Sequence, residues 1–276
     1  MKKIIAAFDG LNYSKSTEIY AIQMAKVANA HLVGIFLDDF TYHSYTLKEA
    51  NYQEILQRKL EGDEKDRLSR IICAKRFEKA CQEAKLTYAI HHDKSLAVQE
   101  LLHESIYSDL IVIDKKESFD QQQDETPAGF IRFLLANSEC PVLVVPAEYK
   151  IIEKISLLYD GSPSSVYAIK MFSYLVPDMK KLPIEIITVK EEGLNRHLPD
   201  HDLMKEFMKR HFTGTVYKLL QGEAETEIVR YMKNRKQNEL LVLGAYHRNM
   251  LSRWFKTSMA DRLMRQLKTP LFIAHR

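Results

Sequence analysis

Short apolar runs alternate with helical stretches along the whole chain. Several runs are apolar at every position, which is typical of parallel strands covered on both faces. One helical stretch starts at Ser162-Pro163, where serine is a good cap and proline suits the first helical position. The alternation predicts open, mostly parallel sheets with helices on both faces. The expected strands are residues 4–8, 32–37, 87–91, 110–113 and 142–145, and then 155–159, 184–189, 215–220, 240–243 and 271–274.

The second half of the chain repeats the first. KIIAAFDG at 3–10 matches KISLLYDG at 154–161, so that Asp9 and Asp160 are 151 residues apart. DLIVID at 109–114 matches ELLVLG at 239–244, and CPVLVVP at 140–146 matches TPLFIAH at 269–275, with offsets of 130 and 129. A repeat of this length indicates two copies of one folding unit. We predict two Rossmann-like α/β domains of five strands each, at residues 1–148 and 152–276.

The first copy carries 21 more residues than the second, because its offset falls from 151 to 130. They lie between its second and third strands, in a charged, helical segment within residues 40–86. One interpretation is a solvated helix that packs an apolar stripe onto the sheet. The other is a lid or a partner-binding arm. Charge-laced helices are usually solvated, which favours the first. The candidates for the stripe are Ile55, Leu68, Ile71, Ile72 and Phe77.

Charge and cysteine content narrow the function classes. The 40 basic and 37 acidic residues leave a formal charge of +3, which argues against a dedicated nucleic-acid or membrane-surface binder. Cys73, Cys81 and Cys140 lack the spacing of metal ligands and are expected to be reduced and buried. No apolar stretch approaches the ~18 residues of a membrane span, and the N-terminus does not resemble a signal peptide. We therefore predict a cytoplasmic protein.

In an open parallel sheet, ligands bind beyond the carboxyl ends of the strands, where the strand order reverses. In the second copy this edge receives Asp160 and a polar loop after Leu243, in which Thr257-Ser258 opens a helix. Free amides at a helix N-terminus favour a phosphate-sized anion. Basic residues outnumber acidic ones here by five, since Asp261 is accompanied by Arg248, Arg253, Lys256, Arg262, Arg265 and Lys268.

On these residues the chain resembles a tandem universal stress protein over essentially its whole length. Members of that family have a first strand ending in Asp and a loop G-x-x-G-x9-G-[ST] that holds the ATP phosphates and ribose. The resemblance implies a site in the second copy for ATP or another adenine nucleotide, without a metal. His247 and Thr257 stand where ATP-binding members have glycine, and a β-branched residue disfavours positive φ. The implied site consists of Asp160, Val189, Gly244, His247, Thr257 and Ser258.

The first copy departs further from the family pattern. Asp114 replaces the first glycine of the loop, and Ala128-Gly129 stand at the positions of Thr257-Ser258. Negative charge in this loop opposes a triphosphate. We therefore expect no nucleotide in the first copy, although Asp9 is kept. The other acidic residues of the loop are Asp120, Asp124 and Glu125.

No enzyme signature is found elsewhere. Asp9 and Asp160 have no paired nucleophile or base at readable spacing, and there is no P-loop or G-x-S-x-G motif. His91 and His92 are neighbours on a predicted strand and point to opposite faces, which argues against a joint metal site. A dinucleotide-binding enzyme of the electron-transfer flavoprotein kind would share this fold. The present sequence lacks the partner-subunit signature of that class.

The resemblance implies a non-enzymatic regulatory or scaffolding protein of the stress response, with nucleotide in the second copy only. Its alternative is an ATP-binding universal stress protein that hydrolyses ATP slowly. We expect the two copies to pair through their last strands, as a dimer built into one chain. A homodimer and an unidentified protein partner stay open, whereas nucleic acid and membrane are not expected.

Overall fold

The computed structural model describes residues 1–9, 13–37, 52–93, 97–116, 129–190, 197–245 and 259–275. The first half consists of β1 (Lys3–Asp9), α1 (Lys15–Ala28), β2 (His31–Leu37), α2 (Tyr52–Glu83), β3 (Tyr88–Asp93), α3 (Ala97–Ser105), β4 (Leu110–Asp114), α4 (Gly129–Asn137) and β5 (Val142–Val145). The second half consists of β6 (Lys154–Leu158), α5 (Pro163–Leu175), the 3-10 helix η2 (Pro177–Lys181), β7 (Ile184–Lys190), α6 (His201–His211), β8 (Val216–Gln221), α7 (Ala224–Lys233), β9 (Glu239–Gly244), α8 (Met259–Gln266) and β10 (Leu271–Ala274).

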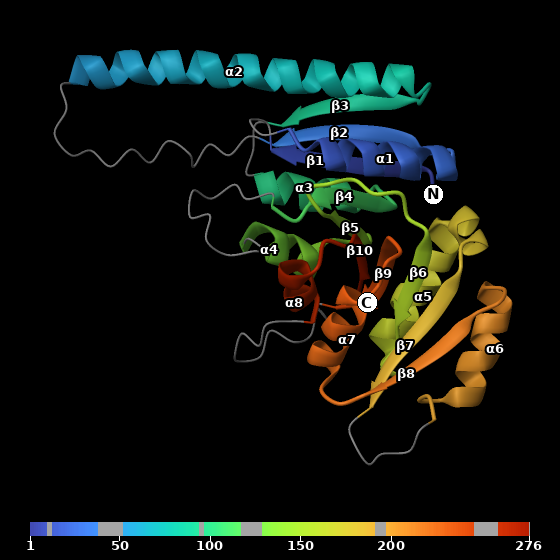
Figure 1. The fold of residues 1–276 in the computed structure, drawn as a ribbon. Helices are drawn as coiled ribbons and strands as arrows, with labels where there is room; N and C mark the ends of the chain where they lie inside the picture. Colours follow the sequence, from blue (N-terminus) through green and yellow to red (C-terminus); the bar gives the residue numbers. More distant parts are fainter. Residues whose placement is uncertain are drawn as a thin grey trace.

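The strands form one sheet in the order β3-β2-β1-β4-β5-β10-β9-β6-β7-β8 (Figure 1). Each half contributes five parallel strands, and the order reverses beside β1 in the first half and beside β6 in the second. The predicted fold class, a mostly parallel α/β sheet with helices on both faces, is confirmed. The two expected sheets are joined edge to edge, because β5 pairs with β10 in antiparallel orientation.

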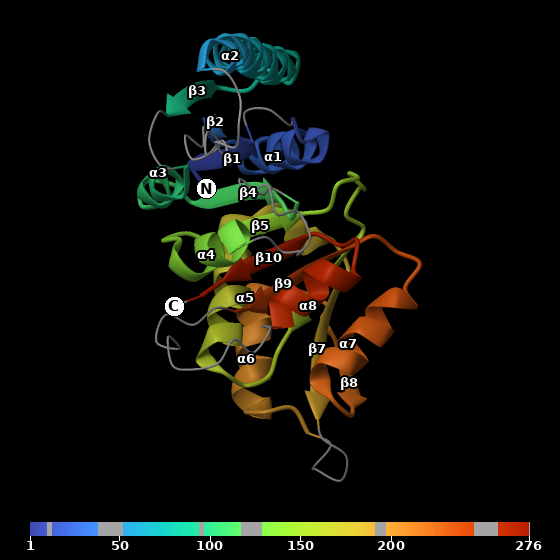
Figure 2. The same ribbon diagram turned by 90° about the vertical axis from the view of Figure 1, so that its left-hand side faces the viewer.

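Two layers of helices cover the sheet and bury one hydrophobic core on each face (Figure 2). Side chains of β1 alternate between the faces, since Ile4, Ala6 and Phe8 enter one core and Ile5 and Ala7 the other. Helices α1, α2, α5 and α6 pack on the first face, and α3, α4, α7 and α8 on the second. Both cores run through the two halves, which makes the halves one packed body.

The junction between the halves has near two-fold symmetry. Leu143 pairs with Phe272, and Val142 and Val144 pair with Ile273 and Leu271. Residues that differ by the 129-residue offset of the repeat therefore occupy equivalent positions on the two sides of the axis. Apolar strand edges of this kind are aggregation sites when exposed, and here each covers the other.

Polar contacts between the halves break this symmetry. Arg132 of α4 and Asp261 of α8 stand at equivalent positions of the repeat, and their Nε and Oδ2 atoms are 3.1 Å apart. Lys115 Nζ donates to the carbonyl oxygens of Met264 and Leu267, at 2.8 and 2.9 Å, at the end of α8. Opposite charges at equivalent positions favour pairing of unlike halves, because two identical halves would bring like charges together.

Among the α2 residues whose side chains are described, those of the C-terminal half pack on the sheet. Phe77 packs against the rings of Phe8 and Phe36, with centroids 5.4 and 6.1 Å apart. The ring also fills the space beside Gly34, where an added Cβ would lie 2.5 Å from Phe77 Cε1. Figure 1 shows the first turns of α2 running past the sheet. The buried stripe consists of Cys73, Ala74, Phe77 and Cys81.

The predicted apolar stripe of α2 is therefore partly wrong. Leu68, Ile71 and Ile72 are 50%, 39% and 65% exposed. At 100° per residue they lie at least 120° around α2 from Phe77, so they face away from the sheet. Phe77 was placed correctly, and Ile55 lies outside the residues whose side chains are described.

The cysteines are free and buried, as the sequence predicts. Burial raises the pKa of the Cys81 and Cys140 thiols to about 12, so that they stay protonated at neutral pH. No helix within the described ranges is long and apolar enough to cross a membrane.

The Arg132–Asp261 pair provides a test of heterotypic pairing. We expect Arg132→Asp to lower the free energy of unfolding by about 2 kcal/mol, because two carboxylates then face each other in a partly buried place. Exchanging both residues, Arg132→Asp with Asp261→Arg, should restore most of that loss. Denaturant titration of the two single variants and the double variant measures the coupling. A double variant as unstable as the sum of the single ones would contradict the pairing.

Candidate functional site

Asp160 lies at the carboxyl end of β6, at the edge of the sheet where the strand order reverses. Its Oδ1 accepts the backbone N–H of Ser162 at 2.9 Å. Burial raises the pKa of Asp160, but hydrogen bonds from Ser162 and Ser165 outweigh this effect, and the net shift is downward. The side chain is therefore an ionised acceptor at neutral pH.

The turn after Asp160 directs the chain into α5. Gly161 has φ +87°, and a Cβ there would lie 2.7 Å from Cβ of Pro199, so only glycine suits this position. Ser162 caps α5 by accepting the N–H of Ser165 at 3.2 Å. The helix N-terminus with its positive dipole end is thereby fixed beside Asp160.

Gly244 ends β9 against the first turn of α5. A Cβ at Gly244 would lie 2.4 Å from the carbonyl carbon and oxygen of Ser164 and 2.7 Å from the amide nitrogen of Ser165. Close packing of strand on helix thus requires glycine here, whatever the edge binds. A match to the family glycine at this position is for that reason no independent sign of a phosphate.

The described part of the predicted site lies at one edge. Val189 follows Thr188, whose hydroxyl donates to the Tyr159 carbonyl at 2.8 Å, and this places Val189 beside the end of β6. Asp160 follows β6, Val189 lies near the end of β7, and Gly244 ends β9. Because β9, β6 and β7 are neighbours in the sheet, the three residues lie at the same edge. His247, Thr257 and Ser258 lie outside the described residues, and their part in the site stays a prediction.

In the first half a carboxylate occupies the equivalent edge. Asp114 is buried, and its two oxygens accept the Ser14 hydroxyl at 2.9 Å and the Lys116 N–H at 3.0 Å. Ser14 is the cap of α1 and also accepts the N–H of Thr17. A carboxylate of the protein itself thus lies at the N-terminus of α1, whereas the second half has Gly244 at that position, packed on the backbone of α5. The predicted acidic loop of Asp120, Asp124 and Glu125, with Ala128, is outside the described residues.

Tyr13 also covers this edge of the first half, and no sequence motif predicted its role. Its ring stacks on Phe8 with centroids 5.0 Å apart and planes 5° apart, and the guanidinium of Arg76 lies 4.6 Å from the ring. The hydroxyl donates to buried Glu18 at 2.5 Å. Burial and then the hydrogen bond to Glu18 raise the pKa of Tyr13.

Two of the charged residues expected near the second-half site are engaged in ion pairs. Arg262 binds Glu225 and lies 3.7 Å from Glu223, and Asp261 is paired with Arg132 of the first half. Arg262 is thus neutralised by carboxylates that are distant in sequence. Arg248, Arg253 and Lys256 lie outside the described residues.

Comparison with known proteins connects this geometry to a family. No family model matches the chain. Its sequence is 25% identical over 167 residues to universal stress protein Slr1230 of Synechocystis sp.. The match covers 59% of this chain and 56% of that protein, so the chain spans little more than half of its curated relative.

The solved structures agree with this result. A universal stress protein of Archaeoglobus fulgidus superposes with a TM-score of 0.69 at 14% identity, over 99% of this chain and 98% of that one. The predicted resemblance to the universal stress proteins is confirmed. A functionally unknown protein of Pseudomonas aeruginosa, PA1789, has the same fold, with a TM-score of 0.59 at 12% identity over 100% and 92% of the two chains. Fold alone does not determine function.

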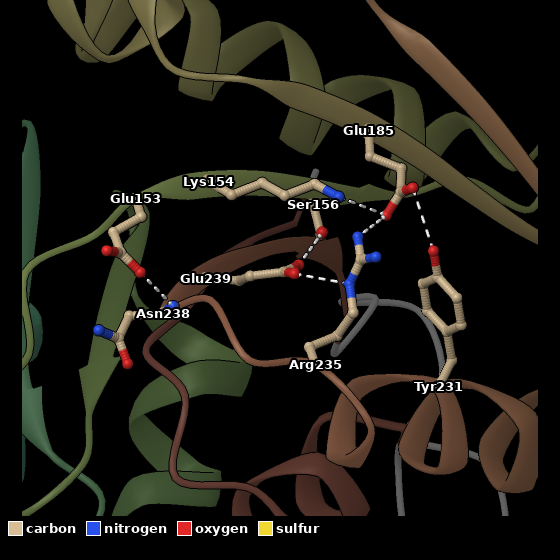
Figure 3. A network of polar contacts seen from close by, with 8 residues as sticks. All are labelled: Glu153, Lys154, Ser156, Glu185, Tyr231, Arg235, Asn238 and Glu239. Carbon is tan, nitrogen blue, oxygen red and sulfur yellow. Dashed lines mark hydrogen bonds and ion pairs between the residues drawn. The ribbon is translucent and has the colours of Figure 1, made fainter.

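A second polar cluster lies at the opposite, amino-terminal edge of this universal stress protein fold (Figure 3). Glu185 accepts Lys154 Nζ at 3.0 Å, an Nη of Arg235 at 2.5 Å and the hydroxyl of Tyr231 at 3.1 Å. Glu239 accepts Arg235 Nε at 2.7 Å and the Ser156 hydroxyl.

This cluster is a structural network. Its two positive and two negative groups balance, and Lys154, Ser156, Glu185 and Glu239 are buried. Burial lowers the pKa of Arg235, but the two carboxylates outweigh it and raise the pKa. Paired, buried charges of this kind specify how strands and helix α7 fit together.

The first half has a smaller version of the network. Lys3, at the position equivalent to Lys154, contacts Glu104 at 2.6 Å, and His91 Nδ1 is 2.7 Å from the same carboxylate. His91 is therefore engaged in a polar contact on the sheet. Among the residues that the structure describes, no group of three or more His, Cys, Asp or Glu could hold a metal ion.

The packing role of Gly244 can be tested by adding one methyl group. We expect Gly244→Ala to lower the free energy of unfolding by about 2 kcal/mol, because the new Cβ overlaps the backbone of α5. Gly129→Ala is the matched control at the start of α4: nothing lies within 4 Å of its Cβ position, and the change should be within about 0.5 kcal/mol. Equal stability of both variants in urea titration would show that Gly244 is not a packing glycine.

Proposed function

We propose that the protein is a non-enzymatic universal stress protein with a regulatory or scaffolding role in the stress response, whose second half binds an adenine nucleotide. The observation that carries the proposal is the difference between the two edges. The first half places the Asp114 carboxylate at the N-terminus of α1, which disfavours a phosphate there, whereas the second half has the packing residue Gly244 at that position and no carboxylate from it.

The chemistry of the second edge suits an adenine nucleotide. The ionised carboxylate of Asp160 can accept a hydrogen bond from an exocyclic amino group, and Val189 offers an apolar surface to a base. The N-terminus of α8, which begins at Met259 directly after Thr257-Ser258, would supply amides and a positive dipole end to phosphates. His247 would add a ring N–H donor in place of a family glycine.

The alternative function is slow ATP hydrolysis. Phosphoryl transfer needs a group that orients the attacking water and charges that stabilise the phosphate. Asp160 is the titratable residue among the described members of the predicted site, and one of its oxygens is already bonded to Ser162. We therefore place hydrolysis second.

We further propose that the two halves act as an intramolecular pseudo-dimer. The β5–β10 edge is used within the chain, so a homodimer would need another surface. A cytoplasmic location and an unidentified protein partner stay predictions.

Calorimetric titration with ATP, ADP and AMP tests nucleotide binding. We expect a single site per chain, and we expect Asp160→Asn to weaken it about tenfold, or about 1.4 kcal/mol, because a charged acceptor is lost. Asp9→Asn is the matched control, since Asp9 is the equivalent residue of the first half, and it should leave the affinity unchanged.

Two results would contradict the proposal. Absence of heat at millimolar nucleotide would exclude a useful site, and equal weakening by Asp9→Asn and Asp160→Asn would remove the distinction between the halves. Release of inorganic phosphate during the same titration would favour the hydrolytic alternative.

A further inference from the structure

His211 ends α6 at the amino-terminal edge of the second half, away from the proposed nucleotide edge. Its Nδ1 lies 2.7 Å from the hydroxyl oxygen of Ser173. That hydroxyl donates its proton to the Lys170 carbonyl at 2.8 Å. Because a hydroxyl has one proton, Nδ1 must be the donor to Ser173, and Nε2 is the nitrogen that can gain or lose a proton.

Aromatic rings hold the imidazole in place. Phe207 lies 4.2 Å from it and Tyr174 5.3 Å, measured between ring centroids. Tyr174 is 57% exposed, so the cluster reaches the surface. The imidazole is thus fixed on one side by Ser173 and bordered by an accessible ring.

Two lysines from different elements act on the same imidazole. Lys170 lies one turn before Tyr174 on α5, and Lys180 comes from η2 with its Nζ 5.7 Å from the ring centroid of Phe212. Burial and then the positive charges of Lys180 and Lys170 lower the pKa of His211.

No carboxylate neutralises this group within the described ranges. Lys170 and Lys180 form no ion pair there, and the nearest acidic residue of η2, Asp178, is paired with Lys181 at 2.8 Å. The other basic residues in the last turn of α6 are Arg210 and Lys209, and Lys209 lies on the far side of the helix from His211. The positive potential at this place is uncompensated.

The dipole of α6 does not account for the cluster. Cations at a helix C-terminus are stabilised, which would raise the pKa of His211, whereas burial and the two lysines lower it. Lys170 lies before the last turn of α5, which contains no basic residue. The lysines therefore need another explanation.

We propose that Lys170, Lys180 and His211 form a binding site for a phosphate-type dianion. The two ammonium groups match its charge, and Nε2 of a protonated His211 supplies a third donor. Tyr174 offers its exposed ring to the organic part of a phosphate monoester. Since the dianion favours the charged imidazole, binding takes up a proton, and affinity rises as the pH falls through the pKa of His211.

The test follows the His211 ring by NMR in the full-length protein. Sulfate is the probe, because it stays a dianion over the range in which histidine titrates, and chloride at the same ionic strength is the reference. We expect sulfate to raise the pKa of His211 by about one unit, which corresponds to about tenfold tighter binding to the protonated form.

Charge-removing variants locate the site. Lys170→Gln and Lys180→Gln should each raise the pKa of His211 without sulfate and weaken sulfate binding several-fold. Lys209→Gln is the matched control, since it removes the same charge from α6 at a position roughly 200° around the helix from His211. It should change neither value appreciably.

Two ligands distinguish the sources of the dianion. If Tyr174→Ala weakens phenyl phosphate but not inorganic phosphate, the site takes a phosphate monoester, and equal binding of both would assign free phosphate. A His211 pKa that is the same in sulfate and chloride would overturn the proposal. An effect of Lys209→Gln as large as that of Lys180→Gln would also overturn it, because it would indicate general screening.

Discussion

The antiparallel pairing of β5 with β10 is the interaction on which the rest of the structure depends. It joins two parallel sheets into one and lets both hydrophobic cores continue from one half to the other. Val142, Leu143 and Val144 face Ile273, Phe272 and Leu271, so two apolar edges that would promote aggregation cover each other. Linking the halves in one chain keeps this contact at any protein concentration.

Symmetry at the junction contrasts with divergence around it. Arg132 and Asp261 form a pair at equivalent positions, and Lys115 binds the end of α8, whereas the equivalent residue of the second half is Ala245. Asp114 accepts a hydrogen bond from Ser14, the cap of α1, whereas the equivalent residue Gly244 packs against the backbone of α5. The halves thus share a scaffold but differ at the edge where this fold binds ligands, which is the physical basis for assigning the proposed nucleotide to the second half.

Local pattern was sufficient for much of the fold. Runs such as LIVI at 110–113 are apolar throughout and correspond to buried strands, because a strand covered on both faces needs no polar position. Contacts between segments that are distant in the sequence could not be predicted from local pattern. The exposure of Leu68 and Ile72 depends on which face of α2 packs on the sheet, and the pairing of Arg262 depends on Glu225 of α7. Lys154, Glu185 and Glu239 are charged residues at the starts of apolar runs, which indicates a buried polar network. Their pairing cannot be predicted without the order of the strands in the sheet.

Native-state hydrogen exchange tests the central claim, that one continuous sheet makes the two halves a single cooperative unit. The amides of β5 and β10 should exchange only through global unfolding, with the same free energy as the central strands β1 and β6. Exchange of β5 and β10 through an opening of lower free energy, with different values for β1 and β6, would contradict this account.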